Sequence, residues 1–435
     1  MTQDGQAGTG ALAGVRVIEF TQILAGPLCG RVLAEMGADV IRIEPPEGDP
    51  RRNQGGVVPN ESKYFQAFNV GKRSIVIDLS SKAGQAAAQR IAQHADVVVC
   101  NYRHGVSQRL GVDYETLSKL NPTLIYCRIT GFGVRSVAAT YGAVNGVVEA
   151  YGGLLIGGGR VGENGLPQNN SGTAFTDHAA GFSATIAICG ALYARRETGK
   201  GQLIDCSLLR SVLSVQSQQV MREPVEDASQ RDPMVHTIQK IREQGGGYKQ
   251  MLDARKSFIS ARGLNVYQGA YQASDGRLIV IGASTNRTRS AARRALGISD
   301  DPILTPPIED VEAPEYVAAL LQLRSQFTEA IKARPSTELI EVLNKAGCPT
   351  ALVNFPEEMS DDPIVAAEGI MVPLVHPTTG PQRVHGPLFE MFGTPTRVQG
   401  PSPRLGEHSR EVLMEAGFDP GEVSTLVDDG AVIQG

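Results

Sequence analysis

The chain has 435 residues, of which 41% are hydrophobic and 20% are charged, and its formal net charge at pH 7 is −5. This composition is ordinary for a globular protein, and the length predicts two domains. A weakly acidic chain has no overall attraction for nucleic acid or for anionic membranes, so an anionic ligand must be held by local groups.

The N-terminal segment MTQDGQAGTG has neither the basic region nor the apolar region of a secretory signal. The six cysteines form no C-x-x-C pair and no cluster with histidine, which fits a reducing compartment and argues against a metal site. The uncharged run after Asp177 is too short for a membrane span. We therefore expect a cytoplasmic protein without a metal.

The first half of the chain alternates apolar strands with helices. Apolar strands between helices are typical of a parallel sheet covered on both faces, and the β-α-β order predicts a doubly wound, Rossmann-like sheet. The predicted strands are Val15–Phe20, Ala38–Glu44, Ser74–Leu79, Asp96–Cys100 and Thr123–Phe132, and the predicted helices between them are Pro27–Met36, Ser81–His94 and Val106–Leu110.

The motifs of nucleotide-binding folds and hydrolases are missing from this half. Glu44 ends the second strand where a ribose-binding acid would lie, but the preceding loop offers only Gly26 and Gly30 and no G-x-G-x-x-G. The chain also has no P-loop and no G-x-S-x-G. These absences disfavour a dinucleotide, a P-loop nucleotide and α/β-hydrolase chemistry.

Basic residues gather near the predicted strand ends of this domain. Loops at the carboxyl ends of parallel strands form the ligand crevice, where Arg and Lys can hold phosphates. Solvated loop charges are the alternative for each of them. The residues are Arg51, Arg52, Lys72, Arg73, Arg103 and Arg109.

Asp177 stands at the start of a segment that is uncharged from His178 to Ala194. Phe182, Ile186, Cys189 and Tyr193 recur at helical spacing, which predicts a buried helix. Asp177 then lies at or just before the first turn, where it acts either as an N-cap or as a carboxylate nucleophile. No cluster of Arg or Lys surrounds it in the sequence to indicate a dicarboxylate substrate.

The second half has a different pattern. Residues 222–262 are polar and resemble a long connection. A hairpin at Tyr271–Gly282, with its turn at Asp275-Gly276, precedes helices at Arg287–Leu296 and Tyr316–Lys332. These elements predict a smaller α+β domain.

Five motifs together resemble the class III CoA-transferases, a family that includes formyl-CoA transferase and is similar to α-methylacyl-CoA racemase. The similarity extends from about residue 11 to residue 432. The motifs are LAGVRVIEFTQILAGPLCG with the sequence up to Arg52, NVGKRSIVIDL, NYRHGVSQRLGVDYETL with the sequence up to Gly133, Asp177 with ETGKGQLIDCSLL, and PSPRLGEHSREVL.

The resemblance implies the domain layout and the assembly. It implies a large domain of residues 11–225 that is completed by residues 350–435, a linker at 226–262 and a small α+β domain at 263–349. It also implies a dimer of two interlocked rings. A flexible glycine segment that covers the intermediate is expected near Gly263, or alternatively at Gly245–Gly247.

The resemblance further implies that Asp177 is the nucleophile of CoA transfer from an acyl-CoA to a free carboxylic acid, with an aspartyl-CoA thioester as intermediate. Acyl-CoA is then a substrate, and no cofactor is permanently bound. Leucine at 24 and proline at 45 differ from formyl-CoA transferase, which argues against formate and oxalate. The implied CoA contacts are Ile23, Leu24, Asn101, Tyr102, Arg103, Arg109 and Leu110.

Two other functions stay open at this stage. A racemase of this family needs an acid and a base beside the acyl α-carbon, and the alignment puts Val144 and Gly269 at those positions. A non-catalytic acyl-CoA-binding protein is the second alternative. The sequence identifies neither the donor nor the acceptor acid.

Overall fold

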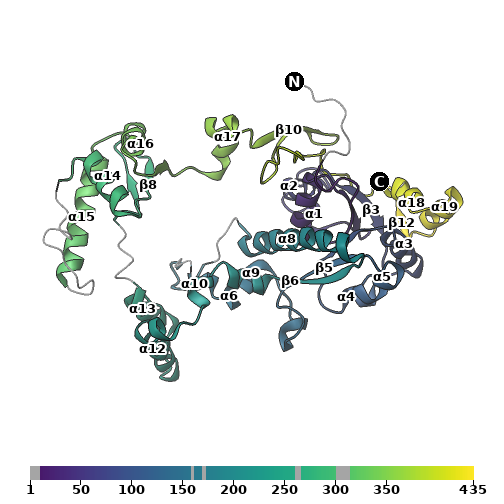
Figure 1. Cartoon of the computed structure of the whole chain (residues 1–435), viewed down its shortest axis with the longest axis horizontal. Helices are drawn as coiled ribbons and strands as arrows, with labels where there is room; N and C mark the ends of the chain where they lie inside the picture. Colours follow the sequence, from purple (N-terminus) through teal and green to yellow (C-terminus); the bar gives the residue numbers. More distant parts are fainter. Residues whose placement is uncertain (1–9, 158–160, 169–172, 260–265, 300–313) are drawn as a thin grey trace. The chain divides into compact units, whose positions relative to one another are not determined.

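The computed structural model describes residues 10–157, 161–168, 173–259, 266–299 and 314–435 (Figure 1). The chain divides into two compact units. One contains the residues up to 221 together with 363–435, and the other contains 222–362.

A seven-stranded sheet with the order β12-β3-β2-β1-β4-β5-β6 forms the centre of the first unit. Strands β1 to β6 pair in parallel, and the short β12 pairs antiparallel with β3 at one edge. An α/β fold around a parallel sheet is therefore confirmed, although the sequence pattern predicts neither β6 nor β12. The strands are β1 (Arg16–Phe20), β2 (Asp39–Glu44), β3 (Arg73–Ile77), β4 (Val97–Cys100), β5 (Ile125–Thr130), β6 (Gln202–Ser207) and β12 (Val432–Ile433).

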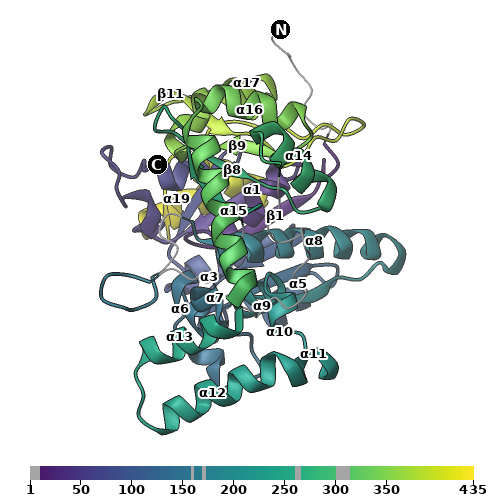
Figure 2. The same cartoon turned by 90° about the vertical axis from the view of Figure 1, so that its left-hand side faces the viewer.

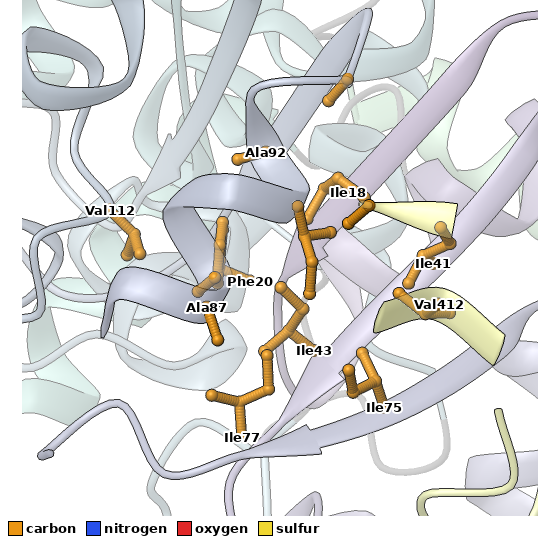
Figure 3. Close-up of a cluster of buried hydrophobic side chains, with 14 of the residues drawn as sticks. Ile18, Phe20, Ile41, Ile43, Ile75, Ile77, Ala87, Ala92, Val112 and Val412 are labelled. Carbon is orange, nitrogen blue, oxygen red and sulfur yellow. The ribbon is translucent and has the colours of Figure 1, made fainter. Parts of the chain in front are cut away.

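Alternate residues of these strands enter two separate cores, one on each face of the sheet. On one face, Ile18 and Ile43 pack with helices α3 (Lys82–Ala92) and α18 (Ser409–Glu415) (Figure 3). On the other face, Val17 and Val40 pack with residues of α1 (Ala25–Glu35) and α8 (Phe175–Thr198). Because successive strand residues point to opposite faces, a strand covered on both faces is apolar throughout its length.

Short helices connect the strands of this unit, and one long helix crosses it. Before residue 222 they are α1 (Ala25–Glu35), η1 (Pro50–Arg52), α2 (Lys63–Asn69), α3 (Lys82–Ala92), α4 (Val106–Arg109), α5 (Tyr114–Leu120), η2 (Val137–Thr140), α6 (Asn145–Tyr151), α7 (Leu154–Gly157), α8 (Phe175–Thr198), α9 (Leu208–Ser214) and α10 (Ser217–Val220). After residue 362 they are α17 (Pro363–Ala367), α18 (Ser409–Glu415) and α19 (Pro420–Asp428), with a hairpin of β10 (Met371–His376) and β11 (Gly380–His385).

Helix α8 turns a different face to the core than the sequence pattern predicts. Its buried stripe contains Ala180, Ala184 and Ile188, whereas Ile186 and Tyr193 are 73% and 74% exposed in the single chain. The small side chains of this stripe allow α8 to pack closely against α1. At Gly181 the two helices are so close that an added Cβ would lie 2.8 Å from the Ala25 carbonyl oxygen. The predicted burial of Ile186 and Tyr193 is therefore wrong for the single chain, because small residues carry the close packing.

The second unit contains a three-stranded antiparallel sheet with the order β7-β8-β9 (Figure 2). The predicted hairpin turn is present, and Gly276 has a φ of +79° there. The elements around this sheet are β7 (Ala270–Gln272), β8 (Leu278–Ile281), α14 (Asn286–Leu296), α15 (Pro314–Lys332), α16 (Ser336–Lys345), β9 (Thr350–Leu352) and η4 (Pro356–Asp361).

The segment expected as a linker is largely helical. It forms α11 (Pro224–Ser229), α12 (Arg231–Glu243) and α13 (Tyr248–Ile259), and the Gly245–Gly247 run separates α12 from α13. Gly263, where a covering glycine segment is expected, lies outside the described residues.

Candidate active site

The strand order of the large sheet reverses between β1 and β4, and the loops after these two strands form the candidate site. In open α/β sheets, ligands bind at this switch point, beyond the carboxyl ends of the strands. Asn101, directly after β4, holds the loop after β1 in place. The Gln22 backbone N–H donates to Asn101 Oδ1 at 2.9 Å, and Asn101 Nδ2 donates to the Gln22 carbonyl at 2.8 Å. Asn101 therefore joins the two loops, in addition to lining the cavity between them.

Asp177 is the third residue of α8, and its side chain is not the N-cap. The cap position is Ala174, which offers no side-chain hydrogen bond. Asn145 of α6 performs this task, because its Oδ1 accepts from the backbone N–H groups of Thr176 (3.0 Å) and Asp177 (3.2 Å). Asn145 Nδ2 in turn donates to the buried Glu149 at 2.9 Å. The Asp177 carboxylate is thus left for another role at the positive end of a helix.

A cavity of about 360 Å³ lies in front of Asp177. Of the residues expected to contact CoA, Arg109 and Leu110 do not line it: Arg109 is exposed at the end of α4, and Leu110 packs against the core. The predicted residues that do line it together with Asp177 are Ile23, Leu24, Asn101, Tyr102 and Arg103.

The polar groups of this cavity differ in their surroundings. Burial raises the pKa of the Tyr102 hydroxyl well above its usual range, so this hydroxyl remains a hydrogen-bond donor at neutral pH. Arg103 is exposed at the cavity wall. Val144 also lines the cavity, while Gly269 belongs to the second unit.

Burial raises the pKa of the Asp177 carboxyl to about 6. The positive charge of Arg51 opposes this rise, and the negative charge of Glu149 adds to it. A carboxylate that is partly removed from water, at a helix N-terminus, is a stronger nucleophile than a solvated one. At neutral pH it is still mostly ionised.

Arg51 reaches the site from η1, after β2, and the sequence marks it only as one of several basic residues that could hold phosphates. No cluster of Arg or Lys surrounds Asp177 in the sequence, but the fold brings Arg51 from a distant segment to the wall of the same cavity. Asp49 holds Arg51 in place, since its Oδ1 accepts the Arg51 backbone N–H at 2.7 Å. The other oxygen of Asp49 accepts from the Ile23 backbone N–H at 3.1 Å and from the buried Arg42 guanidinium.

Asp49 therefore joins the loops that carry Arg51 and Ile23. Ile23 has a φ of +69°, which is unfavourable for a β-branched residue. Such a conformation persists only where the surrounding contacts enforce it, and strained residues of this kind cluster at functional sites. The conformation of this loop at the cavity is thus held by two residues from elsewhere, Asn101 and Asp49.

The other basic residues near the strand ends mostly form internal ion pairs. Arg52 pairs with Glu44 at 2.7 Å and Lys72 with Glu19 at 3.0 Å, with all four side chains buried. Arg73 pairs with Asp39, Glu411 and Glu415. The hypothesis that these basic residues hold phosphates therefore fails for Arg52, Lys72 and Arg73, which stabilise the fold.

Among the described residues, no three His, Cys, Asp or Glu side chains are grouped so that they could hold a metal ion. None of the helices in the described part of the chain has both the length and the apolar character needed to cross a bilayer.

The chain as a whole is similar to one family of known proteins. The model of CoA-transferase family III matches residues 12–409. The chain is 33% identical to the succinate–glutarate CoA-transferase of Agrobacterium fabrum, over 93% of this chain and 95% of that protein. It is 30% identical to the acetyl-CoA:oxalate CoA-transferase of Acetobacter aceti, over 84% and 88% of the two chains.

Solved structures share the fold. A CAIB/BAIF family protein from Brucella suis is 29% identical, with a TM-score of 0.70 over 94% of this chain and all of the other. The Rv3272 protein of Mycobacterium tuberculosis, at 24% identity, has a TM-score of 0.72 over 93% and 99% of the two chains. The resemblance seen in the sequence motifs is confirmed by these matches.

Proposed function

The chain is a CoA-transferase and belongs to CoA-transferase family III, and from this premise we propose that Asp177 carries CoA as a covalent thioester between an acyl-CoA donor and an acceptor acid. The relatives are named for transfer between acyl-CoA thioesters and carboxylic acids. The position of Asp177, at the cavity wall and free of the capping role, is the observation that supports the proposal most strongly.

The reaction begins with the donor. An Asp177 oxygen attacks the thioester carbonyl carbon, the C–S bond breaks, and CoA leaves as the thiolate, which leaves a mixed anhydride between Asp177 and the acyl group. The thiolate then attacks the Asp177 carbonyl of this anhydride. The donor acid departs as its carboxylate, and the aspartyl-CoA thioester remains.

The acceptor repeats these steps in reverse. Its carboxylate attacks the aspartyl carbonyl and displaces the CoA thiolate, which gives a second mixed anhydride. The thiolate attacks the acceptor carbonyl, so the new acyl-CoA leaves and the Asp177 carboxylate is regenerated. No net proton or electron is exchanged, so holding both partners in place supplies most of the required catalysis.

The lining residues have separate roles in this proposal. Ile23 and Leu24 lie in the loop that approaches the thioester, and Tyr102 and Arg103 hold the nucleotide end of CoA. Asn101 acts by positioning Gln22 as well as by lining the cavity. Arg109 and Leu110 are proposed to reach the nucleotide outside the cavity that contains Asp177.

A covalent adduct on Asp177 tests the mechanism. Wild-type protein incubated with acyl-CoA alone should accumulate an adduct that hydroxylamine converts to a hydroxamate on the peptide containing Asp177. Asp177→Asn and Asp177→Ala should both form no adduct and transfer no CoA. A folded Asp177→Asn protein with near-normal turnover would exclude the mechanism.

The proposal also predicts that no α-proton is exchanged. Neither Val144 nor Gly269, at the positions expected for a racemase pair, has a group that can accept or donate a proton. A 2-methylacyl-CoA incubated with the enzyme in D₂O should therefore remain unlabelled at C2, as judged by mass spectrometry. Deuterium incorporation at a rate comparable to turnover would favour racemisation.

A further inference from the structure

A second cavity, of about 770 Å³, lies beside the one that contains Asp177. The two cavities share part of their walls, at Leu24, Arg51, Asn145 and Ala174. A molecule that reacts at Asp177 can therefore extend past these residues into the second cavity, which we call the distal cavity.

The Arg51 guanidinium belongs to the distal cavity. Its central carbon lies 4.1 Å from the centre of the Tyr64 ring, and one of its N–H groups donates to Gln54 Oε1. Tyr64 and Gln54 line the distal cavity and are absent from the wall of the first one. The guanidinium therefore faces the distal cavity, while Arg51 also lines the first cavity and its charge acts on Asp177.

The distal cavity is basic. Lys63 is its second cation, and none of the described residues that line it is Asp or Glu. Within the described part of the chain, neither Arg51 nor Lys63 forms an ion pair with a carboxylate. This separates Arg51 from the neighbouring Arg42, Arg52 and Lys72, each of which has a buried acidic partner.

A half-buried guanidinium without an acidic partner is suited to an incoming anion. Its planar N–H groups match the two oxygens of a carboxylate, and the Tyr64 ring and Gln54 fix its orientation in advance. The adjacent wall is aromatic, since Phe68 lies 5.3 Å from Tyr64 and 5.6 Å from His178 between ring centres. Such a wall accommodates methylene groups.

We propose that the distal cavity binds the non-reacting carboxylate of a dicarboxylic acid, with Arg51 as the residue that determines this specificity. This inference rests on the proposed function, because it assumes that the other carboxylate reacts with Asp177. A spacer of two or more methylene groups lets one carboxylate stay at Asp177 while the other passes Leu24 and Asn145 into the distal cavity, so we expect oxalate and malonate to be poorer acceptors. The acids that fit have a flexible spacer, as in succinate, glutarate and adipate.

Paired acids of equal carbon number test the assignment. The specificity constant, kcat/KM, is measured for glutarate against valerate and for succinate against butyrate, with one acyl-CoA donor. The wild type should prefer the dicarboxylate of each pair. Arg51→Gln should lower the glutarate-to-valerate ratio by roughly 10- to 100-fold, because a charge-assisted hydrogen-bond pair is lost. Arg196→Gln removes the same charge at the opposite end of α8, where Arg196 is exposed, and should leave the ratio unchanged.

A second variant keeps Arg51 in place. Gln54 is exposed and already contacts the guanidinium, so Gln54→Glu supplies a built-in carboxylate that competes with the substrate. This variant should also lower the glutarate-to-valerate ratio of kcat/KM. Both variants should form the Asp177 adduct with an acyl-CoA that has no second carboxylate.

The outcomes separate this inference from the proposed function. If Arg51→Gln lowers kcat/KM for glutarate and valerate by the same factor, Arg51 acts on CoA or on Asp177, and the distal carboxylate site is excluded. A wild type that prefers valerate or oxalate over glutarate would exclude it as well. Failure of the wild type to form any adduct would instead contradict the proposed function.

Discussion

Burial raises the pKa of Asp177 to about 6, and the charge of Arg51 limits that rise. Both effects act on the proposed nucleophile itself. Only the ionised carboxylate can attack a thioester, so the rate of the first step follows the ionised fraction. The same burial makes ionisation unfavourable for the folded state. The activity and the stability of this protein are therefore coupled through one carboxylate.

The first prediction concerns the pH dependence of adduct formation. The rate of Asp177 adduct formation in a single turnover should be half-maximal near pH 6 and should fall as the carboxylate is protonated below that. Arg51→Gln should move this midpoint to higher pH, because it removes the charge that favours ionisation. Arg196→Gln should leave it in place. A midpoint near pH 4 in the wild type would contradict the buried setting of Asp177.

The second prediction concerns stability. The folded-state pKa of Asp177 lies above the unfolded one, so the folded state binds more protons between about pH 4 and pH 6 and loses stability as the pH rises through that range. Asp177→Asn removes the ionisation and should raise the free energy of unfolding at pH 7 by roughly 1–3 kcal/mol.

Chemical denaturation at several pH values measures this effect. The gain from Asp177→Asn should grow between about pH 4 and pH 6, stay constant above, and vanish below pH 4. Asparagine disturbs no cap, because Asn145 supplies the cap of α8. A destabilised Asp177→Asn protein at pH 7 would mean that the ionised carboxylate stabilises the fold.

At the level of elements, α6 and the first turn of α8 together position Asp177. The first residue of α6, Asn145, accepts two N–H groups of α8 and donates to Glu149, one turn further along α6. Each helix therefore fixes the position of the other. The orientation of Asp177 depends on a side chain from a helix that precedes it by about 30 residues in the sequence.

The third prediction compares two substitutions of Asn145. Asn145→Ala removes the cap and should lower the free energy of unfolding by about 1–2 kcal/mol, with a loss of activity. Asn145→Asp keeps an acceptor for the α8 N–H groups but adds a negative charge beside Asp177, so it should raise the pKa of Asp177 and shift the pH profile upward. Thermal unfolding and pH profiles separate the two effects. Equal pH profiles for Asn145→Asp and wild type would contradict this role.

At the level of the whole molecule, the chain enters the first unit, leaves it for residues 222–362 and returns at residue 363. The outward face of α8 carries Ile186 and Tyr193, both largely exposed in the single chain. Large apolar side chains on a regular helix are commonly covered in an assembly. These features are consistent with the dimer of interlocked rings that the family resemblance implies, which stays a prediction.

The fourth prediction tests that assembly by subunit exchange. Tagged and untagged protein mixed under native conditions should form no hybrid dimer over days, because linked rings separate only on unfolding. The same mixture, unfolded in denaturant and refolded, should give hybrids. Native mass spectrometry distinguishes the species. Hybrids that form rapidly without denaturant, or a monomer in light scattering, would exclude the interlocked dimer.

Several features followed from the sequence alone. The apolar strands between helices predicted the parallel sheet, because strand and helix patterns arise from local periodicity, and the motifs indicated the family by their resemblance to it. The helix that begins near Asp177 was predictable for a similar reason, because helix ends are marked by neighbouring residues, whereas only the family resemblance favoured Asp177 as a nucleophile over an N-cap. Six of the eight predicted site residues meet at one cavity: five of them follow β1 or β4, whose carboxyl ends share one edge of the sheet, and Asp177 joins them from the start of α8.

Other features were decided only by the tertiary structure. Arg51 and Arg52 are adjacent in the sequence, yet Arg52 is buried against Glu44 while Arg51 faces the cavities. Two features of α8 likewise depend on which segments pack together: its capping by Asn145 and the burial of its stripe of small residues. Local patterns cannot encode such choices, because the partner of a charge or of a helix face is set by contacts between residues far apart in the chain.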